Sequence, residues 1–144
     1  MRLAFWLVPL LVVGCSQDPP TLQASAQPTT FPQGSSTTLT ITTTDFELIS
    51  PTDVHAHLTR ALTVAHEAEE TGGSEFTNSG HYHVYFDTYE VDPIFQGYQA
   101  SQAIAVHGKA GAHKLIVQLQ GEDHKILEPP VRVEIPITLT STSG

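Results

Sequence analysis

The chain has 144 residues, with six Lys and Arg against fifteen Asp and Glu, and its formal net charge is −9. This length predicts one domain, and the acidic balance argues against nucleic acid as a partner, because such binding depends on a basic surface. One Cys excludes an intrachain disulfide and a zinc site built from several thiolates. The only Met is the initiator, so processing would leave no thioether ligand.

The first fourteen residues have the pattern of a targeting segment. Arg2 is followed by an apolar run, residues 3–13, that only Pro9 interrupts. This run is too short to span a bilayer, which needs about 20 residues, and it is typical of the apolar region of a secretory signal. Residues 1–14 are therefore predicted to be a signal peptide.

The run ends in Leu11-Val12-Val13-Gly14-Cys15, which resembles the lipobox of bacterial lipoproteins. The resemblance implies cleavage before Cys15 and a diacylglycerol on its sulfur, so that the protein is anchored to a membrane of the bacterial cell envelope. Ser16 stands where an Asp usually retains such proteins in the inner membrane of Gram-negative bacteria. The resemblance thus implies the outer membrane, with the protein facing the periplasm.

The segment 15–36 combines the lipidated Cys with a stretch rich in Pro, Gln, Ser and Thr, and we expect it to be a flexible linker. Residues 37–144 are predicted to form an all-β domain, an immunoglobulin-like antiparallel β-sandwich. Alternation of apolar and polar residues and β-favouring composition predict strands at 37–43, 46–49, 81–87, 99–106, 114–119 and 131–139. Pro136 predicts that the last of these is an edge strand.

The segment 51–71 has two interpretations. Ser50, Pro51 and Asp53 resemble a capped helix start, and Gly72 and Gly73 could end that helix. The same segment also carries apolar residues at alternate positions, as a strand would. We expect a strand, because the neighbouring segments all have β patterns.

The eight His residues are the main chemical signal. His81 and His83 stand two apart in a strongly β-like segment, so both side chains are expected on one face of a strand, opposite Tyr82, Val84 and Phe86. Two imidazoles at this spacing can bind one ion at about 2.0–2.1 Å each. A pair alone makes a weak site, so a third ligand is required from elsewhere, with His113 or His124 as candidates.

Three segments together resemble a group of uncharacterised bacterial periplasmic lipoproteins. They are Gly80-His81-Tyr82-His83-Val84-Tyr85-Phe86-Asp87, then Gly111-Ala112-His113-Lys114-Leu115, then Asp123-His124 with Pro130. The resemblance covers roughly residues 46–140 and implies an immunoglobulin-like fold. It also implies that His81, His83, His113 and His124 belong to one constellation.

Three functions remain open from the sequence. The first is an anchored protein that binds a divalent transition metal, zinc or copper, through imidazoles. The second is a metal-free structural or interaction module, in which the same His residues are hydrogen-bonded. The third and least favoured is a metal-dependent enzyme, which would need an open coordination position and a general base such as Asp87, Glu122 or Asp123. We expect a binding protein and no enzyme.

Overall fold

The computed structural model describes residues 18–50, 79–122 and 124–142. These residues form strands and connecting loops, with no helix among them, so the all-β prediction is confirmed. The strands are β1 (Thr21–Gln27), β2 (Thr30–Pro32), β3 (Ser36–Thr44), β4 (Glu47–Leu48), β5 (Ser79–Phe86), β6 (Phe95–Gly97), β7 (Ser101–Ala105), β8 (Gly111–Gly121) and β9 (Arg132–Thr140).

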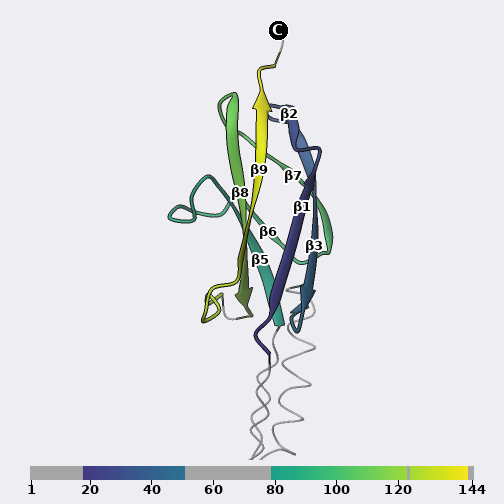
Figure 1. The fold of residues 1–144 in the computed structure, drawn as a ribbon, viewed down its shortest axis with the longest axis vertical. Helices are drawn as coiled ribbons and strands as arrows, with labels where there is room; N and C mark the ends of the chain where they lie inside the picture. Colours follow the sequence, from purple (N-terminus) through teal and green to yellow (C-terminus); the bar gives the residue numbers. More distant parts are fainter. Residues whose placement is uncertain (1–17, 51–78, 123, 143–144) are drawn as a thin grey trace, which may run out of the picture.

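The described strands form two sheets (Figure 1). The smaller sheet has the order β1-β3-β7, and the larger has the order β2-β9-β8-β5-β4, with β6 also paired to β5. The prediction of a purely antiparallel fold is wrong, because β2 runs parallel to β9 and β4 runs parallel to β5. Both exceptions are short strands that do not reach their partners through a hairpin, so no tight turn imposes an antiparallel direction on them.

Residues 21–32, which we expected to belong to a flexible linker, instead form β1 and β2. All of β1 pairs with the Thr-rich strand β3, from Thr21 opposite Thr44 to Gln27 opposite Thr38. Leu22, Ala26 and Phe31 are buried in the core. The prediction was wrong because β1 alternates small residues, Ala with Ser and Gln, whose intrinsic β preference is weak. Pairing with β3 and burial of its apolar side chains stabilise β1 as a strand despite this weak preference.

The core lies between the two sheets and is built by alternate residues of the long strands. In β5, Tyr82 and Val84 are fully buried in the apolar cluster, whereas His81, His83 and Tyr85 are not members of it. Leu115, Val117 and Leu119 are the matching inward residues of β8. The predicted division of residues 81–86 into a packing face and a polar face is therefore confirmed.

Pro136 lies where β9 has a strand on one side only. Its partner on β8 is Lys114, and β2 joins the other side of β9 only from Thr138 onward. The Lys114 carbonyl accepts the Asp87 N–H, so Lys114 directs its backbone groups toward β5, and Pro136 faces away from β8. No ladder hydrogen bond is lost there. The prediction that the last strand is an edge strand is nevertheless wrong, because β9 lies between β2 and β8 in the larger sheet.

Several predicted features lie outside the described residues. They are the signal peptide 1–14, Cys15, Ser16, the segment 51–71 with His55, His57 and His66, and Asp123. In the part of the chain that is described, no helix is long and apolar enough to cross a membrane.

The strands β5 and β8 approach each other so closely at Gly80, next to His81, that this position has no room for a side chain. A Cβ at this position would collide with the backbone carbonyl oxygen of Gln120. We therefore expect Gly80→Ala to force the two strands apart and to lower the free energy of unfolding by about 1–3 kcal/mol in chemical denaturation. Ser101→Ala on β7, where the side chain is exposed, should change it by less than about 0.5 kcal/mol. Equal stability of Gly80→Ala and the wild type would contradict this close approach.

Candidate metal centre

The outward face of β5 carries two imidazoles at its beginning. His81 and His83 lie opposite Gln120 and Gln118 of β8, so the register of this pair of strands fixes both rings on the face that is turned away from the core. His81 is buried, with 3% of its surface exposed, and His83 is half-buried. Their Nε2 atoms lie 3.1 Å apart.

A tight turn after β8 brings the third imidazole to this face. The Gly121 N–H donates to the Lys125 carbonyl at 2.9 Å, and the His124 N–H donates to the Gly121 carbonyl at 3.0 Å. His124 itself has a φ of 60°, a left-handed conformation in which His is enriched among non-glycine residues. The Ser79 hydroxyl donates to Glu122 Oε1, which ties the turn to the first residue of β5.

The three rings form one cluster. The His124 ring centroid lies 4.5 Å from that of His81 and 6.1 Å from that of His83. One nitrogen from each residue can be chosen so that all three lie within 4.8 Å of one another. Three imidazole ligands on a tetrahedral ion at about 2.0–2.1 Å would have nitrogens about 3.3–3.4 Å apart. The His81–His83 pair already has nearly this separation, and the exposed His124 needs only a small approach, so the cluster could hold a metal ion.

The surroundings keep the two strand imidazoles neutral. Burial, together with the positive charges that His83 and His124 would carry, lowers the pKa of His81 to about 4. Burial likewise lowers the pKa of His83, with a smaller contribution from His124. Neutral imidazole is the form that binds a metal, because a protonated nitrogen has no lone pair to donate. Near neutral pH, His81 and His83 are therefore in the form that can bind a metal.

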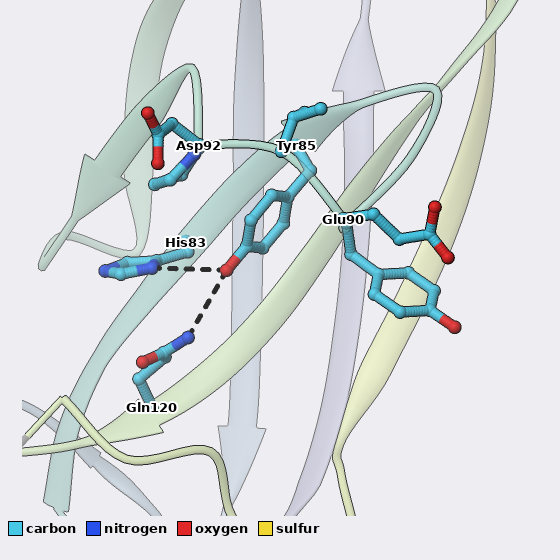
Figure 2. A pocket seen from close by; sticks show the side chains of 8 residues that line it. His83, Tyr85, Glu90, Asp92 and Gln120 are labelled. Atoms are coloured by element: carbon cyan, nitrogen blue, oxygen red, sulfur yellow. Dashed lines mark hydrogen bonds between the residues drawn. The ribbon is translucent and has the colours of Figure 1, made fainter.

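Beyond His83, an open pocket of about 630 Å³ lies between the outer face of the sheet and the loop that follows β5. Figure 2 shows His83, Tyr85 and Gln120 on its floor and Glu90 and Asp92 at its rim. The Tyr85 hydroxyl lies 3.4 Å from His83 Nδ1 and accepts a hydrogen bond from Gln120 Nε2 at 3.4 Å. A row of polar side chains thus connects the pocket with the cluster.

His113, the other candidate for the third ligand, is not brought to this cluster. It stands near the first residue of β8, while the turn with His124 follows the last, and β8 runs most of the length of the sheet (Figure 1). The seven residue-to-residue steps from His113 to Gln120 span about 23 Å of extended strand. The odd separation also places the His113 side chain on the opposite face of β8 from Gln120.

His113 instead forms a separate ion pair with Asp87. Its Nδ1 lies 2.8 Å from Asp87 Oδ2, and its Nε2 lies 2.8 Å from the Lys109 carbonyl oxygen. Both partners are acceptors, so both ring nitrogens must donate, and the Asp87 hydrogen bond raises the pKa of His113. Asp87, named above as a candidate general base, is therefore engaged in a structural contact at the far end of β5.

Sequence reasoning did not single out the two Gln residues beside the cluster. Gln118 and Gln120 are buried, with 1% and 4% of their surface exposed. The Gln118 oxygen accepts from Arg132 Nε at 2.6 Å. A signal was present, because two Gln at alternate positions of an otherwise apolar strand indicate a second polar face.

No family model matches the chain, and neither the curated proteins nor the solved structures include a significant match. The resemblance to periplasmic lipoproteins therefore stays a prediction from the sequence, and the geometry of the cluster is what bears on function.

The lowered pKa of His81 predicts a specific pH dependence of stability in the metal-free protein. The unfolded chain takes up a proton on His81 near pH 6.5, but the folded chain does so only near pH 4. The contribution of neutral His81 is therefore complete above pH 6.5 and is lost as the pH falls toward 4. In denaturant titrations with a chelator present, the stability of the wild type relative to His81→Gln should fall by roughly 1–3 kcal/mol between pH 7 and pH 4.5.

The comparison with His81→Gln removes the contributions of titrating groups that do not contact His81. A stability difference that does not change between these two pH values would show that His81 titrates normally in the folded protein.

Proposed function

We propose that this protein is a membrane-anchored envelope lipoprotein whose His-rich β domain binds a divalent transition metal, zinc or copper. The observation that carries the metal-binding part is the convergence of His81, His83 and His124, from two distant parts of the sequence, with ligand nitrogens within 4.8 Å of one another.

Metal binding accounts for this cluster better than a metal-free hydrogen-bond network does. In a network, the 3.1 Å contact between His81 and His83 uses one donor and one acceptor. Such a network does not include His124, whose ring lies edge-on against that of His81 with no hydrogen bond between the two rings. A metal ion would engage one lone pair from each of the three residues at once. The metal-free structural module is the alternative that a binding measurement would favour if no metal binds.

The donor set favours zinc or copper(II). Three neutral nitrogens suit both ions, and binding is expected to be tighter for copper(II) in general. Neither Cys nor Met occurs among the described residues, and soft copper(I) is bound preferentially by such sulfur ligands. Three protein ligands would leave one position for water or another small ligand.

We propose binding rather than catalysis. The described carboxylate closest in sequence to His124 is Glu122, and it is held by the Ser79 hydroxyl. Asp87 is paired with His113 at the other end of β5. Neither is placed as a general base for a metal-bound water, which a hydrolytic enzyme would require.

The anchor and the location are proposed from the sequence. The lipobox resemblance at Leu11–Cys15 supports lipid attachment at Cys15 and a place in the bacterial cell envelope, at the outer membrane facing the periplasm. The two-sheet all-β domain is compatible with the immunoglobulin-like topology that the resemblance implies, which we retain as a proposal.

The metal site is tested by isothermal titration of the untagged full chain with zinc and with copper(II) at neutral pH. We expect one ion per chain. Alanine at His81, His83 or His124 should weaken binding by more than the roughly 10- to 100-fold that loss of an outer-shell partner costs. His113→Ala is the matched control, because this ring is paired with Asp87 and its loss should leave the affinity unchanged.

Two results would contradict this proposal. The absence of both binding heat and thermal stabilisation with either ion would favour the metal-free module. A loss of affinity in His113→Ala equal to that in His124→Ala would show that the geometry of the cluster does not determine binding.

The anchor has its own test. Cys15→Ala removes the sulfur that would carry the lipid, so the variant should accumulate as an uncleaved precursor or leave the membrane fraction. Cell fractionation with immunoblotting distinguishes these products from the wild type. A variant of mature size that still sediments with membranes would exclude lipid attachment at Cys15.

A further inference from the structure

The side of the His83 ring that faces away from His81 meets a buried phenol. His83 Nδ1 lies 3.4 Å from the Tyr85 hydroxyl, which in turn accepts from Gln120 Nε2 at 3.4 Å (Figure 2). We infer that Tyr85, oriented by Gln120, is a positioning residue of the metal centre that holds His83 with its Nε2 toward the ion. This inference rests on the proposed metal-binding function.

The geometry identifies which nitrogen of His83 binds the ion. Its Nε2 is the atom 3.1 Å from His81 Nε2, close to the separation of about 3.3–3.4 Å that two ligands of a tetrahedral ion would have. An imidazole that ligates through Nε2 carries its proton on Nδ1. That N–H needs an acceptor, and the Tyr85 oxygen is the partner that the structure places beside it.

A phenol suits this position because a hydroxyl is both a donor and an acceptor. In the metal-free cluster, when His83 donates from Nε2 to His81, its Nδ1 has a free lone pair and accepts from Tyr85. When a metal occupies both Nε2 lone pairs, the proton of His83 lies on Nδ1 and the Tyr85 oxygen accepts it. The same side chain therefore supports His83 in both states.

Burial keeps this arrangement in place. Tyr85 exposes 7% of its surface and Gln120 exposes 4%, and both lie on the floor of the pocket. When the Tyr85 oxygen accepts from both His83 and Gln120, its own proton can point into that open pocket, where solvent can accept it. The buried Tyr85 hydroxyl is then not left without partners, which would otherwise be costly.

Zinc titration of Tyr85→Phe in the untagged full chain tests the inference. The substitution keeps the ring and removes only the hydroxyl, and we expect the zinc dissociation constant to rise by about 10- to 100-fold. Tyr98→Phe is the matched control. Its ring centroid lies 5.6 Å from that of His81, but its hydroxyl bonds to Gln96, so its loss should leave zinc affinity unchanged.

Long-range proton–nitrogen NMR of the His83 ring supplies a readout that a purely structural role would not move. With zinc, the wild type should carry the His83 proton on Nδ1. Without metal, the wild type should show one predominant tautomer, whereas Tyr85→Phe should show a mixture. Gln120→Leu, which keeps the phenol but removes the side chain that orients it, should weaken zinc binding in the same direction and serves if Tyr85→Phe does not fold.

The outcomes separate this inference from the proposed function. Zinc binding by the wild type together with unchanged affinity in folded Tyr85→Phe would overturn the role of Tyr85 and leave the metal site standing. If the wild type binds no metal, the proposed function fails. An unchanged tautomer of His83 in metal-free Tyr85→Phe would then overturn the positioning role as well.

Discussion

The antiparallel pairing of β5 with β8 is the constraint on which both the core and the candidate site depend. One register, with Tyr82 opposite Leu119 and Val84 opposite Val117, places four apolar side chains in the core. The same register places His81 and His83 beside Gln120 and Gln118 on the other face. A slip by one residue would exchange the two faces, so the burial of Tyr82 and Val84 also specifies the position of the imidazoles. The packing of the core therefore determines where the candidate metal ligands His81 and His83 lie.

The outer face of this pair is unusual because it is polar and yet largely buried. His81, Tyr85, Gln118 and Gln120 each expose less than a tenth of their surface. Buried polar groups are costly unless they are hydrogen-bonded, and the contacts from His81 through His83 and Tyr85 to Gln120 meet that need in part. The same burial lowers the pKa of His81 and His83. A neutral, ordered pair of imidazoles is thus a direct consequence of how the face is covered.

The sequence predicted the parts of this arrangement that depend on local periodicity. Alternation in residues 81–86 is sufficient to assign His81 and His83 to one face and Tyr82 and Val84 to the other. The choice between His113 and His124 could not be made, because it depends on where β8 pairs with β5 and on the turn at Gly121. The strand β1 was missed for a related reason, since its small residues are ordered by pairing with β3 rather than by their own preference. The local alternation of residues predicts the two faces of β5, whereas long-range strand pairing determines which residues lie beside His81 and His83.

His113 and His124, which stand eleven positions apart, show how strand register and a turn together assign different chemistry to the same residue type. His113 meets a carboxylate and a carbonyl, both acceptors, which favour the imidazolium form and raise its pKa. His124 meets two other imidazoles, whose lone pairs a cation can share. Acid therefore strengthens the contact at the Asp87 end of β5 and opposes ligation at the other end, where protons compete with a metal for His81 and His83. The two ends of one strand pair would respond to pH in opposite directions, although both rest on histidine.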